Sequence, residues 1–204
     1  MNKDLAYSTV ASYVSVLNFV HKMAGFKDFS ENFAIKKSLQ GYRKLGAKAD
    51  TRLPITPSIL KHLVQSLLHT GFSKFLQVLL KAMYLLAFHA FLRVGEITFS
   101  GKAKNIIQYK DLNFVYDQTH QLEAVELNMI NFKHHEGKSR QKLHIKYNLS
   151  NPEMCPVLAL KEYCQVRGSH EGPLFCFMDG KPIPRQYFTK QLQTSLHWAG
   201  CSIK

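Results

Sequence analysis

Residues 74–97 of this 204-residue chain read KFLQVLLKAMYLLAFHAFLRVGEI and follow Ser73, a residue type that commonly caps the N-terminus of a helix. Apolar side chains occupy nearly every face of a helix drawn through this stretch. A helix that is apolar all round is normally buried. The stretch therefore predicts a central buried helix, with Leu85–Leu92 deep in the core and Arg93 directly after it.

The pattern changes on both sides of this helix. Upstream, Thr56 followed by Pro57 predicts another helix start, because Thr caps helices and Pro suits the first helical position. Downstream, short alternating or apolar runs predict strands, two of them joined by the polar tip HHEGKSR at 134–140. Helices before and after a small antiparallel sheet predict an α+β domain. The expected strands are 112–116, 124–132, 142–147 and 173–177, and the expected later helices are 156–166 and 186–199.

Two further helices are expected near the N-terminus. One begins at Ser8 or Thr9 and ends at Gly25, and the other is capped by Ser30 and fades near Gly46. A helical pair of this size buries itself poorly, so we interpret it as part of a larger helical module. The basic stretch 46–53, GAKADTRL, is typical of a linker. We expect a helical piece at 1–48, a linker at 49–55 and the α+β domain at 56–204.

The charge balance indicates a polyanionic partner. The chain has 27 lysines and arginines against 14 aspartates and glutamates, a net charge of +13. Nucleic acid is the commonest partner of so basic a protein, although solubility or an anionic membrane surface would also fit. Four cysteines without a CxxC pair favour a reducing intracellular compartment. The ten histidines offer no metal-ligand spacing, so we expect neither a metal site nor a cofactor.

Arg93 is the first candidate functional residue. A guanidinium stays protonated in proteins and forms a planar fork that fits two phosphate oxygens. Glu96 lies three residues later, on the same helical face, and could hold that fork in place. Spacing alone favours a structural Arg93–Glu96 pair at a helix end over a phosphate site.

The hairpin that joins the second and third strands is the other candidate. A strand pair with a basic tip can lie along DNA, with its lysines on phosphates. A lysine there could also donate a proton to a leaving oxygen. A solvated hairpin that carries lysines against aggregation is the alternative. The cationic residues are Lys133, Lys138, Arg140, Lys142 and Lys146.

Residues 90–97, AFLRVGEI, resemble the first catalytic box of tyrosine recombinases, the phage-integrase family. Residues 155–160 (CPVLAL) and 172–175 (GPLF) match segments that follow this box in the family, in the same order. Residues 8–41 and 52–56 resemble the end of the core-binding domain and its junction with the catalytic domain. The likeness covers nearly the whole chain and is similar to the integrases of DIRS/Ngaro-like and Crypton-like mobile elements.

The resemblance implies a partial helical, SAM-like core-binding domain at 1–48 and a mostly helical catalytic domain with a three-stranded antiparallel sheet at 56–204. It implies DNA recombination or integration, in which a tyrosine attacks a phosphodiester. Arg93 would then clamp the phosphate with Glu96 as its support, and Lys133 would be the general acid, with Lys138 as the second candidate. The other implied DNA contacts are Arg140, Lys142 and Arg52.

One part of the family pattern is absent from these residues. The family places a His-x-x-Arg box and then the nucleophilic tyrosine after the helix that matches 186–199. No His in this chain has Arg three residues later, and the chain stops at Lys204, where the box would begin. We therefore expect the catalytic domain to be incomplete at its C-terminus, and DNA binding without strand cleavage by the chain alone.

The implied partner is double-stranded DNA in the nucleus or another DNA-containing compartment, with no membrane and no small-molecule substrate. A homo-oligomer on DNA is left open. Two alternatives remain at this stage. The chain could be a domesticated, non-catalytic DNA-binding or interaction protein derived from a mobile element. It could also be an unrelated basic α+β protein in which Arg93 and Glu96 are merely structural.

Overall fold

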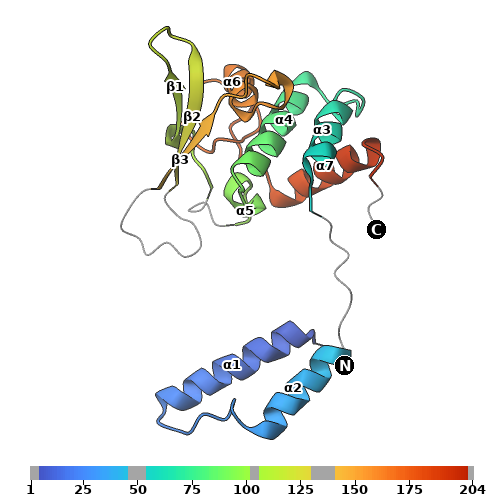
Figure 1. Cartoon of the computed structure of the whole chain (residues 1–204), viewed down its shortest axis with the longest axis vertical. Helices are drawn as coiled ribbons and strands as arrows, with labels where there is room; N and C mark the ends of the chain where they lie inside the picture. Colours follow the sequence, from blue (N-terminus) through green and yellow to red (C-terminus); the bar gives the residue numbers. More distant parts are fainter. Residues whose placement is uncertain (1–4, 46–53, 102–105, 130–140, 202–204) are drawn as a thin grey trace. The chain divides into compact units, whose positions relative to one another are not determined.

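The computed structural model describes residues 5–45, 54–101, 106–129 and 141–201 (Figure 1). The chain divides into two compact units, residues 1–53 and 54–204, and each is described by itself. None of the described helices is long and apolar enough to cross a bilayer.

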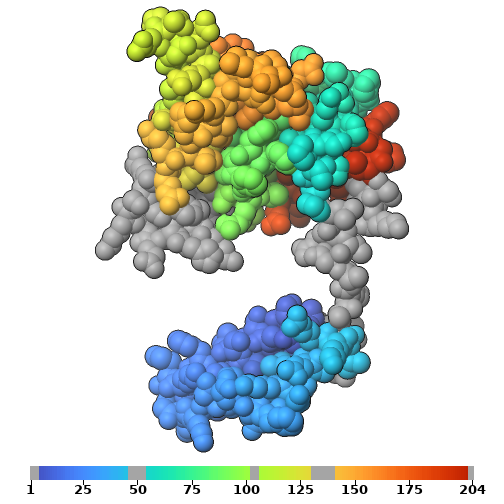
Figure 2. Space-filling view, viewed as in Figure 1, coloured from blue at the N-terminus to red at the C-terminus, as the bar shows by residue number. Residues whose placement is uncertain are grey.

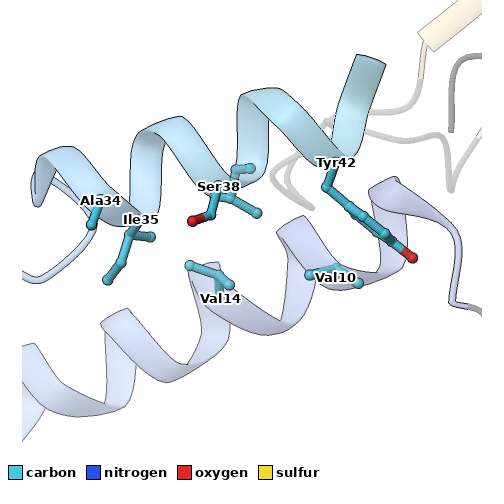
Figure 3. Close-up of a pocket in the computed structure, with 7 residues that line it drawn as sticks. Val10, Val14, Ala34, Ile35, Ser38 and Tyr42 are labelled. Atoms are coloured by element: carbon cyan, nitrogen blue, oxygen red, sulfur yellow. The ribbon is translucent and has the colours of Figure 1, made fainter. Parts of the chain in front are cut away.

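The first unit is a pair of helices, α1 (Tyr7–Met23) and α2 (Phe33–Leu45), which pack against each other. Figure 3 shows Val10 and Val14 of α1 facing Ile35 and Tyr42 of α2 across a groove of about 550 Å³. Buried Asn18 ties α1 to the loop that follows it, because its Oδ1 accepts from the Phe29 N–H at 3.2 Å.

The expected caps of these two helices are wrong. Helix α1 already begins at Tyr7, so Ser8 and Thr9 lie inside its first turn. Ser30 does not cap α2, because its N–H and hydroxyl both donate to the Asp28 carboxylate. Asn32 takes that role, since its side-chain oxygen accepts from the Ala34 N–H at 2.9 Å. The sequence offers several residues that could cap α2, and Asn32 does so because Ser30 is already engaged with Asp28.

The second unit has an α+β fold, which confirms the predicted fold class. Its helices are α3 (Pro57–Ser66), α4 (Lys74–His89), the single-turn α5 (Val94–Ile97), α6 (Pro156–Arg167) and α7 (Arg185–Trp198), with short 3₁₀ turns at Tyr109–Asp111 and Pro152–Met154. Thr56 and Ser73 cap α3 and α4 as predicted, since each hydroxyl accepts a backbone N–H at 3.3 Å. Helix α4 is central, because it packs against both α3 and α6 (Figure 1).

The sheet is an antiparallel meander, ordered β1 (Leu112–Tyr116), β2 (Leu122–Met129) and β3 (Gln141–Lys146). Val125 pairs with Ile145, and all three strands contribute side chains to the core. Since strand side chains alternate between faces, Glu126 and its cross-strand partner His144 lie on the opposite face. These strands confirm the prediction to within two residues, except for the expected end of the second at 132, which lies outside the described residues.

A strand at 173–177 was also predicted, and this is wrong. Within the described chain these residues form only single bridges, Pro173 with Gln108 and Cys176 with Pro182. The buried Arg167 guanidinium donates hydrogen bonds to the backbone carbonyls that would otherwise pair with a neighbouring strand. Its Nε donates to the Leu174 carbonyl at 3.0 Å and its Nη2 donates to the Pro173 carbonyl at 2.9 Å.

Arg167 is a buried cation that, among the described residues, contacts backbone carbonyls and an aromatic face. Its Nη1 also donates to the carbonyls of Gly168 and His170, and its guanidinium carbon lies 4.2 Å from the centre of the Tyr109 ring. This one side chain therefore fixes the loop that follows α6.

Arg167→Met should lower the free energy of unfolding by about 2–4 kcal/mol, because it leaves several carbonyls unpaired. Urea unfolding followed by circular dichroism measures this change. The control Lys190→Met, at an exposed position of α7, should change stability little. A loss below about 0.5 kcal/mol for Arg167→Met would contradict this role.

Candidate functional site

Helix α4 ends in a turn that sets the direction of the next residues. The Leu92 N–H donates to the Ala87 carbonyl at 3.0 Å, and the Phe91 N–H donates to the Phe88 carbonyl at 3.4 Å. This is the Schellman pattern, in which the residue after the cap adopts a left-handed conformation. That residue is Phe91, with φ of 51°.

Because of this turn, the prediction that Leu85–Leu92 lies deep in the core is wrong for the second half of the stretch. Leu85 and Leu86 are fully buried, but burial decreases after them as the helix reaches the surface. Phe91 is 93% exposed and the Arg93 side chain is 61% exposed. Hydrophobicity alone does not reveal this, because a buried helix that ends at the surface carries apolar residues to its last turn.

The Glu96 carboxylate holds Arg93 in two ways. Its Oε2 accepts the backbone N–H of Arg93 at 2.8 Å, which satisfies one of the donors at the start of α5. Its Oε1 lies 3.7 Å from the Arg93 Nη1. The Glu96 side chain is only 12% exposed, so the acid forms the base of the site and the guanidinium reaches into solvent.

The arginine shares a cavity with the strand pair. A space of about 250 Å³ lies between the end of α4, α5 and the adjoining ends of β2 and β3. Figure 2 shows the green surface of α4 and α5 beside the gold surface of β3. The residues that line this cavity are Ala90, Phe91, Leu92, Arg93, Glu96, Met129, Gln141, Lys142 and Leu143. Arg93 and the predicted DNA contact Lys142 therefore line one concave site.

Lys142 is the described cation of the hairpin that lines this site, and its Nζ lies 2.9 Å from the Glu126 carboxylate. His144 Nδ1 lies 3.5 Å from the other oxygen of the same carboxylate. The hydrogen bond from Lys142 is the largest cause that lowers the pKa of Glu126 below its usual range. Desolvation opposes it, and the charge of Lys142 and the hydrogen bond from His144 lower the pKa further. Lys142 is 57% exposed, so its ammonium can still meet an external anion.

Four of the predicted site residues lie outside the described residues. These are Lys133, Lys138, Arg140 and Arg52. Their roles therefore remain predictions. Tyr187, which stands near basic residues in the sequence, packs on Phe177 at 5.0 Å between ring centres. Among the described residues no group of three or more His, Cys, Asp or Glu is arranged to hold a metal ion.

The sequence did not identify Phe91, which lines the cavity beside Arg93, as a candidate site residue. The sequence signal was indirect, because α4 ends without the glycine that usually follows a helix cap and has a phenylalanine at that position. The ring only becomes a candidate once the structure shows it exposed at a cavity shared with Arg93.

Comparisons with known proteins show similarity at the level of solved structures. No protein-family model matches the chain, and no curated protein matches it. The chain is similar to a solved structure of the XerH site-specific recombinase bound to its difH substrate in a pre-cleavage complex, with a TM-score of 0.48 and 14% identity. The match covers 98% of this chain and 55% of that chain, so this chain spans about half of its length.

The support that Glu96 gives to Arg93 can be tested by two substitutions. Glu96→Ala removes the acceptor of the Arg93 N–H and should lower the free energy of unfolding by about 1 kcal/mol. Glu96→Gln keeps an acceptor oxygen and should lose less than half of that amount. Thermal unfolding of both variants measures the difference. Equal losses would show that the hydrogen bond to the backbone is not what Glu96 contributes.

The pKa of Glu126 tests its pairing with Lys142. Lys142→Ala should raise the Glu126 pKa toward its usual range, because the largest lowering cause is removed. Because the pKa of Glu126 is lower in the folded protein than in the unfolded chain, the pair stabilises the fold at pH values above the ordinary glutamate pKa. This stabilisation disappears as the pH falls through the lowered pKa. A carbon-13 NMR titration of the Glu126 carboxyl, with Lys181→Ala as the control, measures the shift. An unchanged pKa in Lys142→Ala would contradict the pairing.

Proposed function

We propose that this chain binds double-stranded DNA through the cavity beside Arg93, in the manner of a tyrosine recombinase. One observation carries the proposal. An arginine held by a nearly buried acid extends from the α4–α5 junction into a concave site that a lysine of the β2–β3 hairpin also lines. The recombinase-like segments at 90–97, 155–160 and 172–175 support this interpretation, as does the net charge of +13.

The chemistry of the site suits a backbone phosphate. The guanidinium is a planar donor with a permanent charge, and Glu96 takes up only part of its donor capacity. An anion that enters the cavity would meet Arg93. The Lys142 ammonium, which pairs with Glu126 on the outer face of the sheet, would reach that anion by exchanging the carboxylate for it. Two cations on one phosphate would neutralise its charge and could stabilise further charge that develops during phosphoryl transfer.

We extend the proposal to the proton donor. Lys133 stands four positions after Met129, which lines the cavity, and is proposed as the general acid for a leaving 5′-oxygen, with Lys138 as the second candidate. Lys138, Arg140 and Arg52 are proposed as further phosphate contacts. Within these 204 residues no His-x-x-Arg sequence supplies a second arginine, so the proposed activity of this polypeptide is binding without strand cleavage.

Salt-dependent binding tests the proposal. Fluorescence anisotropy with a labelled duplex should show affinity that falls steeply with salt concentration, because phosphate contacts release counterions. Arg93→Ala and Lys142→Ala should each reduce the slope of log K against log salt by about 0.9, the value for one lost phosphate contact. Lys181→Ala is the matched control, since Lys181 is exposed and paired with Asp179 away from the cavity lining. Equal slopes for all four proteins would overturn the proposed site.

A covalent assay tests the proposed absence of cleavage. A nicked duplex traps a phosphotyrosyl link if any tyrosine of the polypeptide attacks DNA. We expect no covalent adduct on a denaturing gel, with a complete tyrosine recombinase and its own site as the positive control. An adduct formed by the 204-residue polypeptide would contradict this part of the proposal.

A further inference from the structure

Phe91 has a backbone conformation that its side chain does not favour. With φ of 51° it occupies the left-handed region, which the turn after α4 requires. Glycine is the usual residue there because it has no Cβ, and a bulky side chain raises the energy of this conformation. The folded backbone would therefore be more stable with glycine at this position.

Packing does not compensate for this strain. The Phe91 side chain is 93% exposed, more than any other large apolar side chain among those described. Neighbouring Leu92 and Ala90 do pack against the core, so the exposure belongs to this residue and not to the whole turn. Conformational strain and exposed apolar surface at one residue are features that occur at functional sites.

The position of the ring suggests a ligand. Phe91 lines the same cavity as Arg93 and Lys142, and the apolar side chains of Met129 and Leu143 line it as well. A ligand for this site should therefore combine an anionic group with an apolar surface. A nucleotide of duplex DNA does so, since its phosphate is charged and the carbon atoms of its deoxyribose are apolar.

We propose that Phe91 packs against the deoxyribose of the nucleotide whose phosphate Arg93 binds. The inference rests on the proposed function and adds a residue that provides an uncharged contact. Arg93 would bind the charge, and the Phe91 ring would position the attached sugar and exclude water from the phosphate contact.

Phe91→Gly separates this role from a structural one, because the two roles predict opposite signs. The glycine relieves the left-handed strain, so the melting temperature should rise by about 2–4 °C. The same change should weaken duplex binding by about fivefold, because the apolar area that the ring buries against the sugar is lost. Its salt slope should equal that of the wild type, since no charge is removed.

Two matched variants complete the test. Phe91→Tyr keeps the ring and should bind DNA like the wild type, while Phe91→Ala should bind as weakly as Phe91→Gly without the full gain in melting temperature. A lower melting temperature for Phe91→Gly would show that the ring supports the fold, and would overturn the inference. A changed oligomeric state with unchanged DNA affinity would assign the ring to a protein contact, which also overturns it.

The outcomes distinguish this inference from the function on which it rests. If Arg93→Ala weakens binding and Phe91→Gly does not, the inference fails and the phosphate site stands. If the wild-type chain shows no salt-dependent binding to duplex DNA, the proposed function fails, and the inference with it.

Discussion

The burial of α4 is the constraint on which the second unit depends. Seven of its residues, from Leu79 to Leu86, are buried, and α3 and α6 both pack on it. Because the helix is fixed by its packing, its C-terminal turn emerges at a fixed place on the surface. Arg93 and Glu96 follow that turn directly, so the candidate site is positioned by the core of the unit and needs no flexible loop to hold it.

The polar groups around this core are arranged so that α7 is held to α3 and α4. The Tyr84 and Ser195 hydroxyls lie 3.1 Å apart, and the Ser66 hydroxyl donates to the Ser195 carbonyl at 3.1 Å. Burial raises the pKa of Tyr84 well above its ordinary value, so its hydroxyl remains a neutral hydrogen-bonding group. Among the described residues every buried side-chain nitrogen or oxygen has a hydrogen-bond partner. Among the described residues Glu96 pairs with Arg93 and Glu126 pairs with Lys142, and both cations stay partly exposed.

Local patterns were enough to predict the α+β class, the antiparallel pairing of β2 with β3 and the caps Thr56 and Ser73, since each depends on residues close in sequence. Predictions failed where distant contacts decide the outcome. The stretch 173–177 looked like a strand, but Arg167 takes its carbonyls. The turn after α4 exposes Phe91, although its sequence is as apolar as the core before it. The pairing of Glu96 with Arg93 was predictable from their spacing, whereas the cavity they share with Lys142 requires the sheet register and was not.

The central claim is that the Arg93 guanidinium contacts a phosphate of bound duplex DNA. Chemical modification measures this directly, because phenylglyoxal reacts with accessible arginines and mass spectrometry locates each adduct. Arg185 is exposed at the start of α7 and does not line the cavity, so it serves as the internal reference. We predict that saturating duplex slows modification of Arg93 and leaves the rate at Arg185 unchanged. Equal rates at Arg93 with and without duplex would contradict the account.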